Sequence, residues 1–470
     1  MKRIFAWCWL GVLLGLCGCL SLEDELARQE QQVQRGEVAA AYTAAAEAAS
    51  EDGVDQVYWQ ETAGTLAMWL GNPTVAVAHL SAADDGFNDV ARRRYGATAG
   101  DTAKTLAVND CLLPYAPEGP DRVFVNLYKA VAYGVQQKPG AMRVECNRVR
   151  QRQMEWFGVC AGEIASAADG KDLSTKQRKA VSQTVQKETK VAALSPQASH
   201  AISEESSSAA KYFTALQGFG NAYAAHLVGV ARWCAGDSPR NDLAMAEALA
   251  PGVKTVAQDA AMAERGGRPQ GRVWIYVEDG LAPKRVGRPY SIPYPSIAGH
   301  GAGIGTISFD VPKLVKRAGV SGNYTVNGTA LERLADVDAL AEDAFNREWP
   351  QIIARQVART ILRVTIHETG QAIIRNQTGN ELAPLLFSLG MAVYDVSTNA
   401  ADLRCADLLP KSVWVGALAR PADGQLTLRG NGVPALSVKL NAAGNALVWV
   451  RYATRGSAPT VMVVDLDAKE

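Results

Sequence analysis

The residue pattern of this 470-residue chain changes at Arg272-Val273-Trp274-Ile275-Tyr276-Val277-Glu278-Asp279-Gly280-Leu281-Ala282-Pro283. Apolar side chains at 273, 275 and 277 alternate with larger or polar ones, which is the two-residue period of a β-strand. Gly280 and Pro283 end the pattern, because glycine and proline favour turns. We therefore expect a strand here and a mixed domain over residues 271–470.

Residues 22–265, which precede this strand, have the composition of helices. Ala, Glu, Gln and Leu dominate, and these side chains lose little freedom in a helix. Glycine and proline fall mainly where helices would end, as at Gly71-Asn72-Pro73, Pro139-Gly140 and Pro251-Gly252. Residues 168–208 interrupt this pattern with Lys, Gln, Ser and Thr, which indicates a polar excursion. We expect an all-α domain over residues 19–265.

A weak repeat runs through the helical half. The spacing of Gly64, Gly71 and Leu80 resembles that of a tetratricopeptide-like helical hairpin, in which small residues let two helices approach closely. Gly229 and Gly236 repeat the seven-residue spacing, and a third, imperfect hairpin spans Pro139. Alanine-rich helices can mimic the same pattern. We predict stacked helical hairpins and keep alanine-rich helices without a true repeat as the alternative.

The second half mixes strands with helices. We expect a Gly- and Pro-rich loop over 283–305, a strand over 306–311, and helices between 330 and 396 that include a long helix over 350–374. Short alternating runs separated by Gly, Asn and Pro then predict a C-terminal β-meander. Its expected strands cover 412–418, 425–428, 435–440, 446–452 and 460–466. The fold class predicted is α+β: tetratricopeptide-like hairpins followed by a mixed α/β domain with a largely antiparallel sheet.

The bulk composition is that of an ordinary globular protein. Hydrophobic residues make up 48% and charged residues 20% of the chain, and Lys+Arg balance Asp+Glu at 48 each. This balance gives no electrostatic case for binding nucleic acid.

The N-terminus carries a targeting pattern. Lys2-Arg3 precede an apolar stretch from Ile4 to Leu16, which ends at Leu16-Cys17-Gly18-Cys19. This arrangement resembles a bacterial lipobox, so residues 1–18 are expected to be a lipoprotein signal peptide and Cys19 the lipidated first residue. The alternative is an uncleaved membrane span, but this apolar stretch is short for one. Because Leu20-Ser21 follow, and not Asp, we expect a lipid-anchored protein of the outer membrane that faces the periplasm.

Five further cysteines remain in the mature chain: Cys111, Cys146, Cys160, Cys234 and Cys405. Their wide spacing contains no C-x-x-C pair and therefore no zinc-knuckle signal. The periplasm permits disulfides. We expect mainly buried free thiols, with one disulfide left open.

Searches for catalytic motifs give little. His367-Glu368 lacks the second histidine of a zinc-protease helix, since position 371 is Gln. The stretch Gly299 to Gly305 fails the dinucleotide spacing and follows a proline-rich loop. It contains His300, Gly301 and Gly303, which we predict as the best place for a ligand contact. No metal, cofactor or catalytic residue is predicted, and the chain is not expected to be an enzyme.

One stripe of basic residues stands out on the expected long helix. Arg355, Arg359 and Arg363 recur every four residues, with His367 next in line. They are interpreted either as a solvated face or as arginines that turn inward to hold a carboxylate.

Three segments carry a resemblance to a known family. They are Glu278-x-Gly280-x-x-Pro283, the helix with Arg355 and Arg359, and Ala401-Asp402-Leu403-Arg404 with Leu409-Pro410. In this order, after an alanine-rich half and a lipobox, they resemble an uncharacterised family of bacterial envelope lipoproteins with tetratricopeptide-like helices. The chain departs from that pattern at Cys405 and Ala406, where Ser and Trp are preferred. The resemblance implies work in cell-wall assembly and supplies no catalytic residues.

The resemblance also suggests a structural network. If the three segments meet, Arg355 or Arg359 should lie within hydrogen-bond reach of Asp402 or Glu278, with Arg404 nearby. A buried arginine needs such a partner, because an unpaired buried charge is costly.

Two functions follow as hypotheses. The first is a membrane-anchored scaffold whose stacked hairpins bind an envelope protein partner on a concave surface. The second is a glycan-binding protein or a novel enzyme that uses the loop over 283–305. A deep pocket with convergent polar groups at that loop would favour the second hypothesis.

Overall fold

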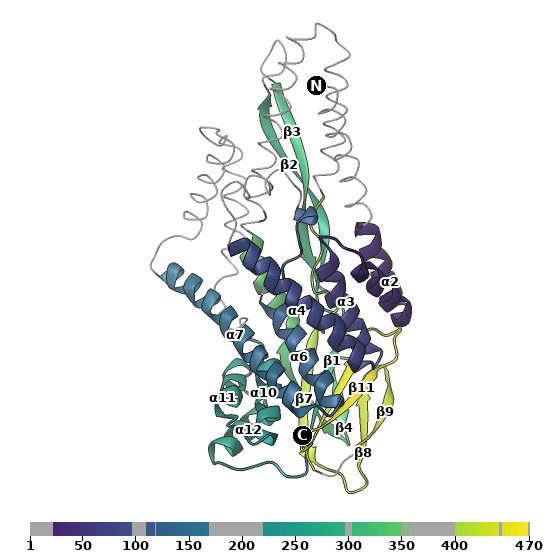
Figure 1. Ribbon diagram of the computed structural model, residues 1–470, viewed down its shortest axis with the longest axis vertical. Helices are drawn as coiled ribbons and strands as arrows, with labels where there is room; N and C mark the ends of the chain where they lie inside the picture. Colours follow the sequence, from purple (N-terminus) through teal and green to yellow (C-terminus); the bar gives the residue numbers. More distant parts are fainter. Residues whose placement is uncertain are drawn as a thin grey trace.

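The computed structural model describes residues 22–95, 110–117, 119–168, 220–296, 303–349, 352, 356, 400–440 and 444–468. Helices pack on one face of a five-stranded sheet, and a four-stranded sheet packs on its other face. A long two-stranded ribbon extends from this layered body (Figure 1). The predicted α+β class is therefore confirmed.

The first layer consists of helices, as predicted for residues 22–265. Residues 22–34 are helical. They are followed by α2 (Val38–Ser50), α3 (Gln56–Trp69), α4 (Pro73–Tyr95), the 3-10 helix η1 (Asp110–Leu112), α6 (Pro120–Val135), α7 (Pro139–Ala168), α10 (Ala222–Cys234), α11 (Arg240–Leu249) and α12 (Lys254–Glu264). The predicted polar excursion lies outside the described residues, apart from Ala168 at the end of α7.

Glycines make the turns between paired helices. Gly71 has φ +68° and Gly236 has φ +88°, conformations that cost a residue with a Cβ atom. The Gly71 N–H bonds to the Met68 carbonyl at 3.0 Å and the next N–H to the Ala67 carbonyl, which satisfies the last groups of α3. Both glycines were predicted to lie at turns, and both predictions are confirmed.

Small residues also set the distance between paired helices. A Cβ added to Gly64 would lie 2.6 Å from Leu80 Cγ, and one added to Gly229 would lie 2.7 Å from Leu243 Cδ2. The α3–α4 and α10–α11 hairpins therefore use the same glycine–leucine contact. Helical hairpins are thus observed, while their tetratricopeptide character stays a prediction.

Two sheets form the other layers. The strands are β1 (Arg272–Asp279), β2 (Lys284–Ser296), β3 (Gly303–Val315), β4 (Tyr324–Val326), β5 (Thr329–Ala330), β6 (Glu332–Asp336), β7 (Ser412–Ala419), β8 (Gln425–Gly430), β9 (Val433–Lys439), β10 (Ala446–Tyr452) and β11 (Thr460–Asp465). The five-stranded sheet has the order β11-β10-β1-β7-β6, and the smaller sheet has the order β5-β4-β8-β9. Only the β1–β10 pair is parallel in these two sheets.

The alternation in β1 explains the layering. Trp274 and Tyr276 join the core shared with the helices, while Val273, Ile275 and Val277 join the core between the two sheets. A strand buried on both faces needs apolar groups at nearly every position. The helical half and the central sheet therefore share one hydrophobic core.

The expected loop over 283–305 is wrong for most of its length. Residues 284–296 and 303–315 are strands β2 and β3 of the ribbon. The prediction of a loop rested on the prolines of this stretch. Their pairs are Pro289 with Asp310, Pro293 with Thr306, Pro295 with Ile304, and Pro312 with Gly287. All four pairs fall on the same alternate set of the ladder, where a proline nitrogen can face away from its partner strand.

The expected C-terminal meander also needs correction. The strand positions agree with the prediction, but β8 and β9 lie in the smaller sheet, where β8 pairs with β4 and β9 pairs with β8. Strand β10 then pairs in parallel with β1. Hydrophobic period alone does not specify which sheet a strand joins.

Residues 337–349 are helical, and so are Ile352 and Gln356. The rest of the expected helix over 350–374, including Arg355, Arg359, Arg363 and His367, lies outside the described residues. No helix in the described parts of the chain has the length and apolar character needed to cross a membrane.

Candidate functional site

Glu278 is the penultimate residue of β1 and is buried in the core. The Tyr128 and Tyr223 hydroxyls donate to its carboxylate at 2.9 and 3.1 Å, and the Trp449 indole N–H donates at 2.9 Å. Burial raises the pKa of Glu278, and the Arg451 guanidinium opposes that shift. Through these hydrogen bonds Glu278 of β1 connects α6, α10 and β10.

Arg451 of β10 is the cation beside Glu278, with its Nε 3.7 Å from Glu278 Oε2. It also donates to the carbonyls of Glu278, Tyr452 and Leu408 at 3.3, 3.2 and 3.0 Å. Its guanidinium lies 4.8 Å from the centre of the Trp69 ring. Sequence analysis missed Arg451, although a single arginine inside the apolar strand Ala446–Tyr452 was the signal.

Asp402 and Arg404 form a bidentate pair. Arg404 Nε and Nη2 donate to the two Asp402 oxygens at 2.9 and 2.8 Å, and Nη1 donates to Asp55 at 2.7 Å. Nη2 also donates to the carbonyls of Asp110 and Leu113. Arg404 is 1% exposed, so it anchors the segment around 402 to η1 and to the start of α3.

The proposed contact of Arg355 or Arg359 with Asp402 or Glu278 lies outside the described residues. Within the described chain, Arg404 holds Asp402 and Arg451 neighbours Glu278. His300, Gly301 and Cys19 also lie outside the described residues. Gly303 is the first residue of β3 and pairs with Ser296.

The cysteines are mostly free thiols where they are described. Cys146, Cys234 and Cys405 are free, and Cys111 is disulfide-bonded. The side chain of Cys160 lies outside the described residues. Among described residues, no group of three or more His, Cys, Asp or Glu side chains could hold a metal ion.

A cavity of about 390 Å³ opens where the three segments that carry the resemblance come together. Pro283, Ile352 and Gln356, and Asp402 with Arg404, all line it. Its walls come from the base of the β2–β3 ribbon, the helix over 337–349, and the segments around 110–121 and 400–409. The volume is that of a small-ligand pocket.

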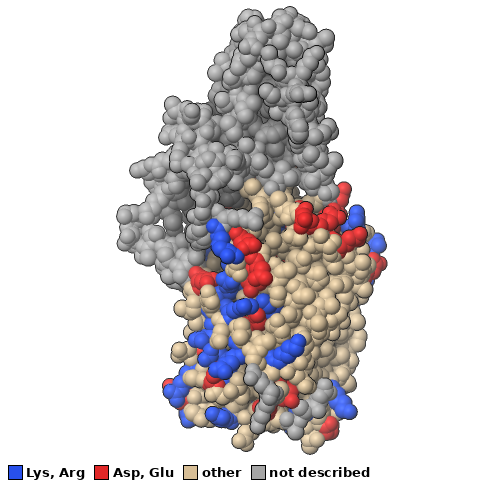
Figure 2. Space-filling model, in the orientation of Figure 1, with Lys and Arg blue, Asp and Glu red and all other residues tan. Residues whose placement is uncertain are grey.

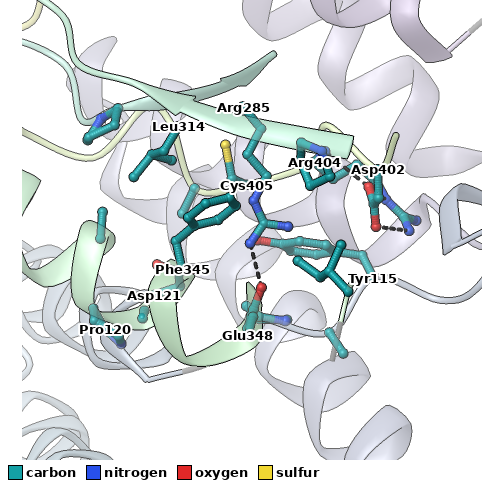
Figure 3. A pocket seen from close by; sticks show the side chains of 18 of the residues that line it. Tyr115, Pro120, Asp121, Arg285, Leu314, Phe345, Glu348, Asp402, Arg404 and Cys405 are labelled. Atoms are coloured by element: carbon teal, nitrogen blue, oxygen red, sulfur yellow. Dashed lines mark hydrogen bonds and ion pairs between the residues drawn. The ribbon is translucent and has the colours of Figure 1, made fainter. Parts of the chain in front are cut away.

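An ion pair lies at the centre of the cavity (Figure 3). Arg285 of β2 donates to Glu348 at 2.6 Å, and its guanidinium lies 5.4 Å from the centre of the Phe345 ring. Figure 3 also shows the hydroxyl end of Tyr115 directed toward Arg285, with the Cys405 sulfur on another wall. The cavity thus combines two aromatic rings with two ion pairs, Arg285–Glu348 and Arg404–Asp402, and with the further carboxylates Asp110 and Asp121.

Three titratable groups of the cavity, Arg285, Cys405 and Tyr115, have raised pKa values. Burial alone would lower the pKa of Arg285, but Glu348 and the neighbouring acidic groups raise it above its ordinary value. Burial raises the pKa of the Cys405 thiol to about 12. It also raises the pKa of Tyr115 well above its usual range. At neutral pH these three groups are a cation, a thiol and a phenol.

Sequence reasoning missed Arg285, Glu348, Phe345 and Tyr115. Arg285 follows Pro283 directly, and Phe345 and Glu348 are three residues apart, as neighbours on one helix face are. Neither signal marks a site by itself, because the cavity forms only when η1, the β2–β3 ribbon and the helix over 337–349 pack together.

Comparisons with other proteins find no relative. No protein-family model matches the chain, and neither a curated protein nor a solved structure matches it. The fold and the cavity therefore define the class by themselves: a three-layer α+β protein with a pocket lined by both apolar and charged side chains.

Proposed function

We propose that this chain is a lipid-anchored protein of the bacterial cell envelope that binds a neutral glycan in the cavity around Arg285. The envelope location rests on Leu16-Cys17-Gly18-Cys19. The binding function rests on the cavity, where Arg285, Glu348, Phe345 and Tyr115 converge.

The cavity supports binding of an uncharged polar ligand. Both arginines of the cavity wall are already paired, Arg285 with Glu348 and Arg404 with Asp402 and Asp55. A charged ligand would disturb these pairs, whereas hydroxyl groups can bond to them. Sugar rings present C–H faces that pack on aromatic rings, and Phe345 and Tyr115 supply such rings. A glycan combines both kinds of contact.

The pocket chemistry supports binding over catalysis. The Cys405 thiol has a pKa of about 12, so little thiolate forms at neutral pH and the nucleophile is weak. The Tyr115 hydroxyl stays protonated for the same reason, burial.

The packing of the helices gives less support to a scaffold that works through their inner face. Ala63, Leu66, Leu127 and Val228 are buried in the core shared with the central sheet. In an open solenoid this inner surface would be concave and free. Here the chain's own sheet fills it.

The test compares two tryptophan substitutions on β3. Leu314 lines the cavity, whereas its neighbour Lys313 is exposed and does not. Leu314→Trp fills the cavity, and Lys313→Trp is the matched control. Thermal unfolding is measured with uncharged soluble glycan fragments of a bacterial cell wall.

We expect the fragments to raise Tm of wild type and Lys313→Trp, because a ligand that binds only the native state stabilises it. Leu314→Trp should show no rise. An equal rise in all three proteins, or none in wild type, would contradict the proposal.

A further inference from the structure

A second candidate site lies outside the cavity, on the face formed by α4, α6 and α7. Arg122 of α6 donates to Asn88 Oδ1 at 2.5 Å, and Arg152 of α7 donates to the same oxygen at 2.8 Å. Two guanidinium groups therefore meet at one uncharged oxygen. Like charges at this distance repel each other unless an anion lies near both.

The charges around this point do not balance. Lys129 contacts Asp84 and Glu145, Arg148 contacts Glu145, and Arg152 contacts Asp84 and Glu155. With Arg122 the cluster has four basic and three acidic side chains. Within the described chain, Arg122 is the member with no carboxylate in ion-pair distance.

Arg122 is also incompletely satisfied as a hydrogen-bond donor. Its Nε is buried and has no partner among described residues. Burial lowers the pKa of Arg122 and the neighbouring Arg152 lowers it further, while Asp84 and Glu155 act in the opposite direction. The net shift is downward, so a further negative charge at the site would favour the charged form of Arg122.

The cluster remains open to solvent on one side. Arg122 and Asn88 are half-buried, and the Arg152 side chain is 14% exposed. Figure 2 shows basic side chains gathered over the region of α7, with acidic ones among them. An anion can therefore approach the two guanidinium groups from outside.

We infer that Arg122, Arg152 and Asn88 form a binding site for a phosphate group. A phosphate has several acceptor oxygens and can bond to two guanidinium groups at once, a geometry that arginine favours. It also supplies the negative charge that the cluster lacks. The phosphate can belong to inorganic phosphate or to a phospholipid headgroup, and the test separates the two.

The experiment is isothermal titration of the purified full chain in a chloride buffer of constant ionic strength. The probes are inorganic phosphate and glycerophosphoglycerol, the soluble headgroup of phosphatidylglycerol. Three variants are compared with wild type. Arg122→Gln removes the unpaired charge, and Asn88→Asp places a carboxylate between the two arginines. Arg143→Gln is the control, since Arg143 lies on α7, is 57% exposed and contacts Asp237 outside the cluster.

We expect wild type and Arg143→Gln to bind at least one probe with the same Kd. Arg122→Gln and Asn88→Asp should bind it at least about tenfold more weakly, which corresponds to the loss of one good charged contact. Asn88→Asp should also raise Tm without any probe, because it supplies the missing charge internally.

Binding of glycerophosphoglycerol alone would identify a lipid headgroup, and binding of phosphate alone would identify a free phosphate. Either outcome supports the site. Absence of binding to both probes, or equal binding by Arg122→Gln and wild type, would overturn it. The outcome is independent of the cavity, because none of the three residues lines it.

Discussion

Glu278 and Arg451 face each other across the parallel strands β1 and β10, and both side chains are fully buried. Burial raises the pKa of Glu278 and lowers the pKa of Arg451, so each group is disfavoured in its charged form. Tyr128, Tyr223, Trp449 and three backbone carbonyls offset this cost by hydrogen bonds. The pair joins the helical layer to the sheet.

Removing only the arginine should therefore be worse than changing both partners. Arg451→Met leaves Glu278 without its cation and should lower the free energy of unfolding by about 3–5 kcal/mol. The double variant Glu278→Gln/Arg451→Met should be more stable than Arg451→Met alone. Urea unfolding followed by tryptophan fluorescence measures both. A double variant whose loss equals the sum of the single losses would show that the two residues are not coupled.

Glu61 on α3 predicts a pH dependence. Burial raises its pKa well above the ordinary 4.5, and nearby Asp121 and Asp407 add to the shift. The folded state then holds a proton that the unfolded state releases. The stabilisation is complete below pH 4.5 and is lost as pH rises toward the folded pKa.

Glu61→Gln removes this titration. Its free energy of unfolding relative to wild type should therefore increase between pH 5 and pH 8, as measured by urea unfolding at each pH. The two curves would run parallel if Glu61 titrated alike in both states.

A side chain at position 64 should disturb the packing of α3 on α4. A Cβ at this position would lie 2.6 Å from Leu80 Cγ, so Gly64→Ala should cost about 1–3 kcal/mol through overpacking. Gly53→Ala is the control, because a Cβ there meets nothing within 4 Å. Adding Leu80→Ala should relieve the clash. Chemical unfolding measures the free energy of unfolding of each variant. Equal losses in Gly64→Ala and Gly53→Ala would contradict close packing of α3 on α4.

Cys19 is the residue on which the proposed lipid anchor depends. Cys19→Ser should leave the precursor unprocessed and unlipidated, because only a thiol forms the thioether to the lipid. Metabolic labelling with a fatty-acid probe measures this. Equal labelling of the variant and of wild type would remove the basis for the lipoprotein assignment.

Local patterns predicted the elements better than their arrangement. The two-residue period located β1 and β10, and glycines located the turns at Gly71 and Gly236. Prolines in the ribbon suggested a loop, because their effect depends on which way each nitrogen faces in a ladder. The direction of each proline nitrogen is set by the pairing of β2 with β3, which no local sequence pattern specifies.

The candidate site was predicted only in part. Asp402 and Arg404 were named as a network, and they do pair, but their partner Asp55 lies in the distant helical half. Arg285 and Glu348 are 63 residues apart and have no motif in common. Such a cavity arises from tertiary packing, and no short stretch of sequence encodes it.

The central claim is that the cavity around Arg285 binds an envelope glycan. Its most direct measurement is photo-crosslinking in living cells from p-benzoylphenylalanine placed at Phe345, which lines the cavity. The same group at Val144, which is 50% exposed and outside the cavity, is the control. With cell-wall sugars metabolically labelled, we predict a labelled adduct from position 345 and none from position 144. Equal labelling at both positions, or none at 345, would contradict the account.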